Sequence, residues 1–426
     1  MPAPKSLRPK ATLAIRNAVL ATCDRGPSDP GLVPNGAVAV EDRRIAWLGR
    51  DRDLEEAVDL EGAAVLDARG GLVGPGLVDS HTHLVFAGER AGEFALRVSG
   101  KSYLDMALSG GGIAATTRAT HAASDDTLLQ GALGRARRLL AQGVTTVEVK
   151  SGYGLGVEAE LRLLRVVADL AHALWAELTI VPTLLAHAVP PERLEDRDAF
   201  VKEICEELVP AAAKERLATS CDVFAEEAAF RPEEARRILA AARRHGLLPR
   251  VHADQLTDGG GARLAAEAGC ASADHLERVD DAGIEAMARA GVVAGLLPLS
   301  TLYLGAERYA PARRLLEAGV PIALATNVNP GSAMSENVGL TLSLGCLKLG
   351  LSPAEALVAM TAGGARSLRL PDVGRLAPGC EADLVVWGCG SAEHLAWHMA
   401  VNHALVVVKR GRVVHEAAPG TAVDCR

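Results

Sequence analysis

Hydrophobic and polar positions follow one pattern at the two ends of the chain and another in its middle. Residues 11–68 and the last segment carry short β-type runs, such as GAVAVEDRRIAWLG and HALVVVKRGRVV, separated by Gly, Pro and Asp turns. Such runs are typical of antiparallel strands and hairpins. Two unrelated small sheets would explain this pattern. The more economical prediction is one small β-sandwich domain, formed by residues 1–70 together with residues 372–426.

The middle of the chain alternates between short apolar strands and amphipathic helices. Eight strand candidates occur in order: LVDSHTHL, TTVEVKSG, TIVPTLLAHA, CDVFAEE, LPRVHADQ, ASADHLE, VVAGLLPLS and PIALATN. Between them, stretches such as VEAELRLLRVVADLAHAL and ERYAPARRLLEAG have apolar residues three and four positions apart. This alternation predicts an α/β fold, a (β/α)8 TIM barrel over residues 71–371. The alternative, a doubly wound open sheet, would favour a Gly-x-Gly-x-x-Gly turn after a strand, and the sequence has none there.

Composition indicates the setting of the protein. The 426 residues carry 45 Lys and Arg against 53 Asp and Glu, a net charge of −8. This balance argues against a nucleic-acid partner and gives no reason to expect an anionic membrane partner. The sequence has no apolar run of membrane-spanning length and no secretory apolar core near its start. The eight cysteines are scattered without a C-x-x-C pair, so we expect reduced thiols in a cytoplasmic protein, neither a disulfide framework nor a thiolate metal site.

Histidines gather where barrel enzymes carry their chemistry, at the C-terminal ends of strands. Five of the twelve lie at predicted strand ends: His81 and His83 in the first strand, His187 in the third, His252 in the fifth and His275 in the sixth. The other seven fall in predicted helices, loops or the terminal sheet, and we expect them to be structural or solvated: His121, His172, His245, His394, His398, His403 and His415.

The pair His81 and His83 predicts a set of metal ligands. Alternate residues of a strand face the same side, so the two imidazoles share a face. Neutral imidazoles suit a first-row divalent ion, and His252 on a second strand end makes a set of three. His275 on the next strand offers a supporting or catalytic imidazole. The alternative interpretation is a group of hydrogen-bonded core histidines, which five imidazoles at the strand ends of one barrel make the weaker hypothesis.

Catalytic metal sites usually also hold a carboxylate that ligates the ion or accepts a proton. The end of the eighth strand is the expected place for it, and the residue there is Asn327. Asp79 and Asp254 each lie two residues from a histidine of the predicted ligand set. The sequence alone assigns neither of them as a ligand.

Several longer stretches resemble the amidohydrolase superfamily, whose members are metal-dependent hydrolases with a (β/α)8 barrel and a flanking β domain. PGLVDSHTHL is similar to the first-strand signature of that superfamily, and VGRLAPGCEADLVVWG is similar to its return strands. Within the superfamily, the chain resembles the imidazolonepropionases of histidine degradation over nearly its whole length. The stretches that carry this resemblance are HTHLVFAGERAGEFALRVSGKSYLDMALSGGGI, GVTTVEVKSGYGL, AHAVPPE, VHADQL, SADHLE, LLPLSTLYLG and ATNVNPGS.

The resemblance implies a hydrolase that acts on a cyclic amide, converting 4-imidazolone-5-propanoate to N-formimidoyl-L-glutamate with one zinc or iron ion. It also implies a homodimer. The matching metal positions are His81, His83 and His252, and His275 matches the catalytic histidine beside the metal. Positions that match substrate contacts are Arg90, Tyr153 and His187 and the loop residues Asn329, Gly331 and Ser332.

The residue types at these positions suit that substrate. Arg90 is a natural bidentate partner for the substrate carboxylate, and Tyr153 can donate a hydrogen bond to the same end. An imidazole such as His187 can polarise the carbonyl of the ring amide. Lys150 matches the position of a carboxylated lysine in relatives with two metals, but we expect one metal here and a structural or electrostatic role for this lysine.

Two positions raise the question of activity. Gln255 stands where the family has Glu or Gln, and it can hold substrate by hydrogen bonds but cannot shuttle a proton. Asn327 stands where the family has the Asp that ligates the metal and accepts a proton. Its oxygen can ligate the metal, but it is neutral and a poor base. We therefore expect weaker metal binding and a proton that leaves through His275.

Two alternatives to an active imidazolonepropionase stay open. One is an impaired paralogue that binds the substrate without efficient turnover, which Asn327 favours. The other is a different cyclic-amide hydrolase or aminohydrolase on the same barrel. The presence of Arg90, Tyr153 and the NPGS loop favours the histidine-pathway substrate over this last alternative.

Overall fold

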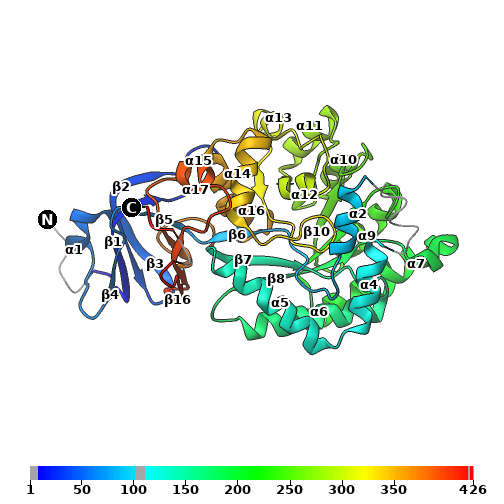
Figure 1. Ribbon diagram of the computed structural model, residues 1–426, viewed down its shortest axis with the longest axis horizontal. Helices are drawn as coiled ribbons and strands as arrows, with labels where there is room; N and C mark the ends of the chain where they lie inside the picture. Colours follow the sequence, from blue (N-terminus) through cyan, green and yellow to red (C-terminus); the bar gives the residue numbers. More distant parts are fainter. Residues whose placement is uncertain (1–7, 101–110, 421–422, 426) are drawn as a thin grey trace.

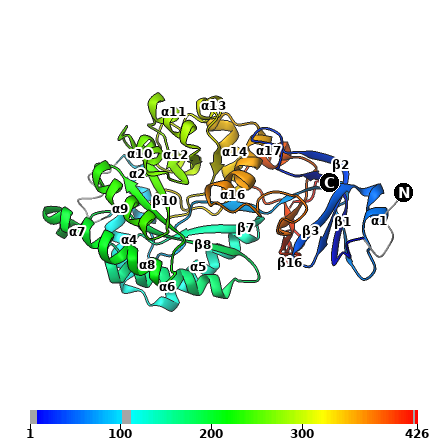
Figure 2. The ribbon, with the colours of Figure 1, turned by 180° about the vertical axis from the view of Figure 1, so that it is seen from behind.

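The chain forms a barrel with a β-sheet at one end, in a computed structural model that describes residues 8–100, 111–420 and 423–425 (Figure 1). The N-terminal strands, in blue, and the C-terminal strands, in red, lie side by side in that sheet. Figure 2 shows the same arrangement from behind. Segments from opposite ends of the sequence therefore build one domain.

The terminal sheet has eight strands in the order β16, β15, β14, β5, β1, β2 and β3, with β4 paired to β1. Their bounds are β1 (Leu13–Ala21), β2 (Leu32–Glu41), β3 (Arg44–Arg50), β4 (Ala64–Asp67), β5 (Leu72–Pro75), β14 (Leu384–Trp387), β15 (Ala404–Lys409) and β16 (Arg412–Glu416). This is the small β domain shared by both termini that the sequence predicts. β5 lies just beyond the predicted boundary at residue 70, yet it pairs with β1 and β14. The chain passes to the barrel between β5 and β6.

Alternation along β1 shows how this sheet buries both of its faces. Leu13 and Ile15 contribute to one apolar cluster, whereas Ala14 between them contributes to another, which also includes Leu54 of α1 (Leu54–Ala57). Successive side chains of a strand point to opposite faces of its sheet. A strand with apolar residues at consecutive positions is therefore suited to a sheet that is covered on both sides.

The barrel consists of eight parallel strands that pair in sequence order from β6 to β13. Their bounds are β6 (Leu77–Asp79), β7 (Val144–Lys150), β8 (Thr179–Ala186), β9 (Ser220–Ala225), β10 (Leu248–Ala253), β11 (Ser272–His275), β12 (Val293–Leu296) and β13 (Ile322–Leu324). The segments that follow β6 and β13 are joined by two backbone hydrogen bonds. The Asn327 amide donates to the His81 carbonyl over 3.0 Å, and the His83 amide donates to the Val328 carbonyl over 2.9 Å. The predicted (β/α)8 barrel is confirmed.

Helices connect or follow the barrel strands and cover their outer side, while α17 lies between β14 and β15 of the terminal sheet (Figures 1 and 2). Their bounds are α2 (Ala91–Val98), α4 (Ile113–Ala122), α5 (Asp125–Leu140), α6 (Val157–Ala173), α7 (Arg197–Glu203), α8 (Val209–Lys214), α9 (Pro232–Arg244), α10 (Gly261–Ala268), α11 (Asp281–Ala290), α12 (Pro298–Tyr303), α13 (Ala312–Glu317), α14 (Val338–Leu349), α15 (Pro353–Val358), α16 (Gly364–Ser367) and α17 (Ala392–Trp397). Shorter 3-10 or π segments are η2 (Asp51–Asp53), η3 (Pro191–Asp196), η4 (Ile204–Leu208) and η5 (Ala359–Gly363). Within the described ranges, no helix has the length and apolar character needed to cross a membrane.

Local chemistry sets several helix ends. α5 begins where the Ser124 hydroxyl accepts a hydrogen bond from the Thr127 amide, a typical N-cap. The pattern ERYAPARRLLEAG predicts a longer helix than α13, which begins only at Ala312. Pro311 explains the difference, because a proline disfavours helical backbone in the residue before it.

Candidate metal centre and active site

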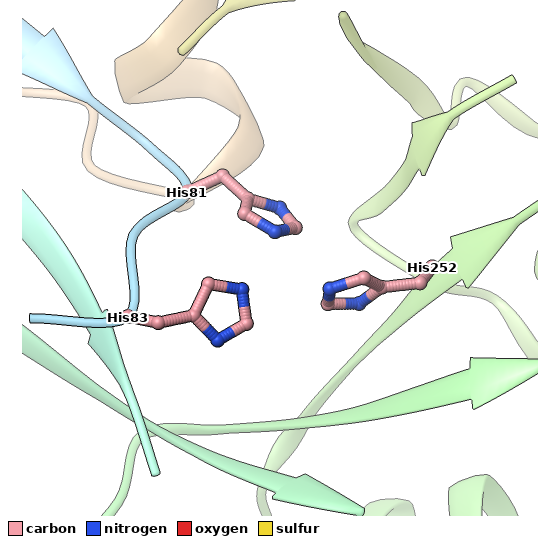
Figure 3. Close-up of side chains that lie close together, drawn as sticks. All are labelled: His81, His83 and His252. Atoms are coloured by element: carbon pink, nitrogen blue, oxygen red, sulfur yellow. The ribbon is translucent and has the colours of Figure 1, made fainter. Parts of the chain in front are cut away.

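Three histidines converge at the end of the barrel where the strands have their carboxyl ends (Figure 3). His252 lies within β10, whereas His81 and His83 lie in the segment after β6, which ends at Asp79. One nitrogen of each imidazole lies within 4.8 Å of one nitrogen of each of the others. All three side chains are buried. The structure thus brings the three residues of the predicted ligand set together, two of them from a loop and not from a strand.

Carboxylates behind the cluster fix the orientation of two of its rings. His81 Nδ1 donates to Asp274 Oδ2 over 2.7 Å, and His252 Nδ1 donates to Asp222 Oδ1 over 3.1 Å. These hydrogen bonds leave Nε2 of each ring without a proton in the neutral imidazole, so each Nε2 offers a lone pair. Metal-binding histidines almost always donate their other ring nitrogen in this way.

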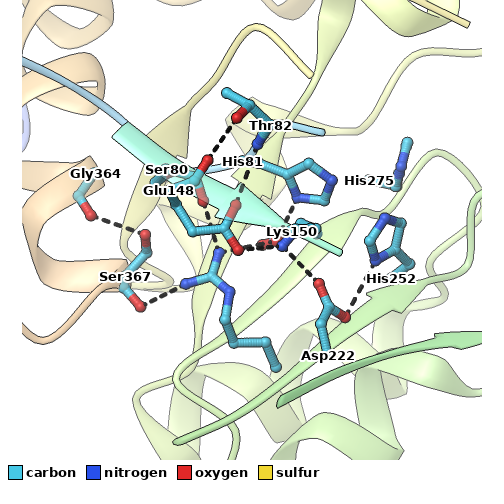
Figure 4. Close-up of polar contacts among 12 residues, drawn as sticks. Ser80, His81, Thr82, Glu148, Lys150, Asp222, His252, His275, Gly364 and Ser367 are labelled. Carbon is cyan, nitrogen blue, oxygen red and sulfur yellow. Dashed lines mark hydrogen bonds and ion pairs between the residues drawn. The ribbon is translucent and has the colours of Figure 1, made fainter. Parts of the chain in front are cut away.

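Two buried cations hold these carboxylates in turn (Figure 4). Lys150 Nζ lies 2.7 Å from both Asp222 Oδ2 and Glu148 Oε1. Arg250 Nη2 donates to Asp274 Oδ2 over 3.0 Å. Burial opposes protonation of Lys150, but the charges of Asp222 and Glu148 raise its pKa above the ordinary value. Three carboxylates and two cations therefore form a paired network behind the imidazoles, and Lys150 belongs to it as a counterion.

Asn327 lies just beyond β13, beside the histidines. Its φ of 56° is in the left-handed region, which asparagine adopts more readily than most residues. Asn327 Oδ1 is buried and has no hydrogen-bond partner within the described part of the chain, and the same is true of His81 Nε2. Buried acceptors without partners are rare. An unpartnered carboxamide oxygen and unprotonated imidazole nitrogens are a donor set that fits a divalent cation.

His275 is the last residue of β11, and its ring centroid lies 5.3 Å from that of His252. Its φ is 85° and that of Leu276 is 69°, so two consecutive residues are in strained left-handed conformations. His275 Nδ1 lies 3.6 Å from Glu277 Oε1, and Thr301 Oγ1 donates to the same oxygen over 2.9 Å. The carboxylate of Glu277 is therefore placed to stabilise a positive charge on His275.

A cavity of about 520 Å³ opens beside these groups. The predicted site residues that line it are His83, Arg90, Tyr153, His187, His252, Gln255, His275, Asn327, Asn329, Gly331 and Ser332. Of the predicted site residues, His81 alone is not among its lining residues. Apolar side chains, including Ile113 and Phe224, form part of the wall. A small polar molecule can thus reach the histidines while part of its surface is buried.

Two arginines, Arg90 and Arg97, line this cavity. Arg90 Nη2 donates to Glu93 Oε2 over 2.6 Å, while Arg90 Nε is buried without a hydrogen-bond partner among the residues described. A Cβ at Gly331 would lie too close to the guanidinium of Arg90, so a larger residue there would displace the end of the arginine side chain. Arg97 Nη2 donates to the Gly331 carbonyl over 3.2 Å. Arg97 was not predicted from sequence, although it lies in the same stretch of the chain as Arg90.

The loop after β13 is held by the side chain of Asn329. Its Oδ1 accepts hydrogen bonds from the amides of Gly331 and Ser332, each over 2.8 Å, and its Nδ2 donates to the Asn327 carbonyl over 2.7 Å. This is the hydrogen-bond pattern of an Asx turn. Most hydrogen bonds of the Asn329 side chain therefore go to backbone groups of its own loop. These bonds also fix the backbone next to Asn327.

The hydrogen bond made by His187 sets the tautomer of its neutral ring. Its Nδ1 donates to the Gly152 carbonyl over 3.0 Å, and burial lowers its pKa to about 4. In the neutral ring the proton is then on Nδ1, and Nε2 can accept a hydrogen bond but cannot donate one. Polarisation of a carbonyl by this imidazole would require a proton on Nε2, and it stays a prediction. His187 is suited instead to bind an N–H group.

The two aspartates that the sequence left unassigned serve the backbone. Asp79 accepts hydrogen bonds from the amide and the hydroxyl of Thr326, which ties β6 to the end of β13. Asp254 accepts hydrogen bonds from the amides of Gly261 and Ala262 at the start of α10. Neither carboxylate belongs to the groups of residues that can hold an ion together with His83 or His252.

Comparisons with known proteins agree with this site. The chain matches the model of the amidohydrolase family over residues 72–416. It is 74% identical to an imidazolonepropionase from Anaeromyxobacter dehalogenans over 419 residues, which cover 98% of this chain and 100% of that protein. It is 54% identical to an imidazolonepropionase from Myxococcus xanthus over 381 residues, 89% of this chain and 90% of that protein.

The fold also matches a solved structure of an adenosine deaminase from Xanthomonas campestris with bound zinc. The TM-score is 0.72 at 18% identity, and the match covers 98% of this chain and 94% of the other. This likeness concerns the fold, whereas the family model and the two relatives concern the sequence. The chain belongs to the amidohydrolase family and, within it, to the imidazolonepropionases.

Proposed function

We propose that this chain hydrolyses the cyclic amide of 4-imidazolone-5-propanoate to N-formimidoyl-L-glutamate in histidine degradation. The observation that carries the proposal is the cluster of His81, His83 and His252 at a cavity that two arginines line. In the reaction, water adds its oxygen to the ring carbonyl carbon. The carbon–nitrogen bond of the amide breaks, and a proton is transferred to the departing nitrogen.

One divalent ion, zinc or iron, would be held by the three histidines and by Asn327 Oδ1. When bound, such an ion supplies Lewis acidity and lowers the pKa of water in its coordination sphere. The donors are imidazole nitrogens and one amide oxygen, which suit either metal. The unpartnered Asn327 Oδ1 and His81 Nε2 support this assignment.

The neutral charge of Asn327 is the main difficulty for activity, and the network behind the histidines offers compensation. Asp274 and Asp222 accept hydrogen bonds from His81 and His252. These hydrogen bonds make the two imidazoles more electron-rich ligands. The network has three carboxylates and two cations, so it adds a net negative charge near the cluster. We infer that the negative charge of the carboxylates behind the histidines substitutes in part for the carboxylate that Asn327 lacks.

Arg90 and Arg97 are placed to bind the substrate carboxylate in the cavity. Charge-assisted pairs of guanidinium and carboxylate are among the stronger hydrogen bonds in proteins. With its carboxylate bound to these arginines, the substrate would have its imidazolone ring toward the histidine cluster. His187 Nε2 would then accept a hydrogen bond from a ring N–H. Tyr153 would line the cavity beside that ring.

His275 is the group that we propose to move the proton. It lines the cavity, and the carboxylate of Glu277 lies near its Nδ1. A positive charge on His275 would be stabilised by Glu277, so the ring can take a proton from water and deliver it to the departing nitrogen. Glu277 is then a positioning residue, because it acts through His275. Gln255 would hold the substrate by hydrogen bonds only.

The test is a turnover assay with 4-imidazolone-5-propanoate on metal-loaded protein, with the product identified by mass spectrometry. We expect N-formimidoyl-L-glutamate to form with the wild type, and to form far more slowly with His275→Gln. Binding of the substrate without turnover would contradict the proposal and support an impaired paralogue. Turnover of other cyclic amides but not of this one would support a different hydrolase.

The resemblance to imidazolonepropionases further suggests a homodimer, and the scattered free cysteines favour the cytoplasm. Analytical ultracentrifugation of the full chain at low micromolar concentration is the measurement for the dimer. A single species with the mass of one chain would contradict it.

A further inference from the structure

A second cluster of metal-binding side chains lies far along the chain from the first. It consists of His398, just after α17, His403, just before β15, and Cys425 near the C-terminus. One possible ligand atom of each lies within 4.8 Å of those of the other two. These residues are outside the lining of the active-site cavity. The proposed hydrolysis gives them no role.

His403 has the environment of a ligand. It is 1% exposed, and its Nδ1 donates to the Val423 carbonyl over 3.1 Å. In the neutral ring this hydrogen bond places the proton on Nδ1 and leaves a lone pair on Nε2. Nε2 is buried and has no hydrogen-bond partner among the described residues. Such a buried, unpartnered nitrogen requires an explanation, and a bound cation provides one.

His398 completes a pair of imidazoles. Its ring centroid lies 5.0 Å from that of His403, and its Nδ1 is also buried without a hydrogen-bond partner in the described ranges. Its backbone is held at the end of α17, where the His398 amide donates to the His394 carbonyl over 3.0 Å. Two rings that each have an unpartnered nitrogen therefore lie beside each other on backbone that is held by hydrogen bonds.

The thiol of Cys425 is brought to the imidazoles by hydrogen bonds of the tail. The Cys425 amide donates to the Gly388 carbonyl, and the Val423 amide donates to the Asn402 carbonyl over 2.9 Å. These bonds hold the tail against the segments on either side of α17. Cys425 itself is exposed, so an ion bound there would be accessible to water.

We propose that His398, His403 and Cys425 form a second metal site, which binds zinc and fastens the C-terminal tail to the sheet. Two imidazoles and a thiolate are ligands that zinc accepts in tetrahedral sites, and water can occupy the fourth position next to the exposed thiol. α17 packs on α14 of the barrel. The site joins the segment that follows α17 to the tail, residues 423–425. Its role is structural, because it fastens the tail residues 423–425 to the segment that holds His398 and His403.

Cobalt is the probe that separates this site from the catalytic one. The full-length protein is prepared under a reductant that does not bind metals and is loaded with Co²⁺. A thiolate ligand gives a sulfur-to-cobalt charge-transfer absorption, whereas the ligands proposed for the catalytic centre contain no sulfur. We expect this absorption in the wild type and two equivalents of bound metal per chain.

Cys425→Ser should abolish the charge-transfer absorption and one equivalent of metal, and leave hydrolysis unchanged. Cys346→Ser is the matched control, because Cys346 lies on α14 outside the cluster, and it should keep both. Zinc should also slow digestion of the tail by carboxypeptidase in the wild type and not in Cys425→Ser. One equivalent of metal in the wild type, an absorption that survives Cys425→Ser, or a disulfide between Cys389 and Cys425 that persists under the reductant would overturn the proposal.

Discussion

The two histidine clusters of this protein are alike in their ligand type and differ in what surrounds them. In the barrel, His81 and His252 donate to carboxylates that are themselves paired with Arg250 and Lys150. In the second cluster, His403 donates to a neutral backbone carbonyl. The barrel cluster opens into a cavity, whereas the second joins the segment of His398 and His403 to the residues around Cys425. Charged support and space for a substrate suit catalysis, and neutral support between segments suits a structural clamp.

Two buried lysines extend the comparison. Lys150 in the barrel lies between two carboxylates, which raise its pKa above the ordinary value although burial opposes this. Lys409 in the terminal sheet lies 2.6 Å from Asp383 Oδ2, and burial lowers its pKa. The barrel thus contains an excess of negative charge around its lysine, while Lys409 has one carboxylate partner and the balanced pair Arg410–Glu381 beside it. The difference predicts that the sheet pair affects stability only and that the barrel network also affects the metal.

The largest expected effect is on stability, from Lys409→Met. Removal of the lysine leaves Asp383 buried without its cation, and breaking a buried pair on one side costs about 3–5 kcal/mol. We expect the free energy of unfolding in urea to fall by this amount, while kcat of the folded protein stays unchanged. Lys10→Met, at an exposed position, is the control and should leave stability nearly as it was. A large fall in kcat of folded Lys409→Met protein would break the comparison.

Asp222→Asn should mainly weaken metal binding at the barrel cluster. The change removes the negative charge of the carboxylate that orients His252 and is one of the two counterions of Lys150, and it leaves only one acceptor oxygen. Loss of such a supporting carboxylate typically weakens metal affinity about 10–100-fold. Competition with a chelator, followed by elemental analysis, measures the effect. The exposed Asp169→Asn on α6 serves as the control.

The second cluster sharpens this prediction. If it is independent, Asp222→Asn releases one equivalent of metal and leaves the sulfur-to-cobalt absorption in place. Loss of both equivalents together would show that the two clusters are not separate.

A smaller effect is expected from Arg90→Lys. Lysine keeps the charge but cannot present two parallel donors to a carboxylate. Loss of one charge-assisted hydrogen bond is worth about 1.5 kcal/mol or more, so KM should rise about tenfold with little change in kcat. Steady-state kinetics with imidazolone propanoate measures both constants. Arg138→Lys is the control, because Arg138 pairs with Glu336 on the surface and lies outside the cavity. An unchanged KM would remove Arg90 from substrate binding.

The fold could be predicted from sequence because its patterns are local. Eight apolar runs that alternate with amphipathic stretches indicate a (β/α)8 barrel. β5 was assigned to the barrel because its residues LVGP are apolar and look like the start of the first barrel strand. Whether such a run pairs with β1 or with β7 depends on contacts that are distant in sequence.

The histidines of the catalytic cluster could be predicted from their positions at strand ends, but their supporting charges could not. Asp222 and Asp274 each stand inside an apolar strand, in CDVFAEE and ASADHLE, and an acid in such a strand was the available signal. The sequence does not indicate which cation pairs with which acid, because each pair joins two different strands: Lys150 of β7 with Asp222 of β9, and Arg250 of β10 with Asp274 of β11. His398 and His403 were expected to be structural or solvated, since one lies after a helix and the other before a strand, with no pattern that links them to Cys425.

The central claim is that negative charge behind the histidines lets a neutral Asn327 serve in a working site. The most direct measurement compares wild type and Asn327→Asp for kcat with imidazolone propanoate and for metal content of the same samples. We predict that the wild type binds metal at the barrel cluster and turns over substrate, and that Asn327→Asp binds the ion more tightly. An inactive wild type combined with an active Asn327→Asp variant would contradict the claim.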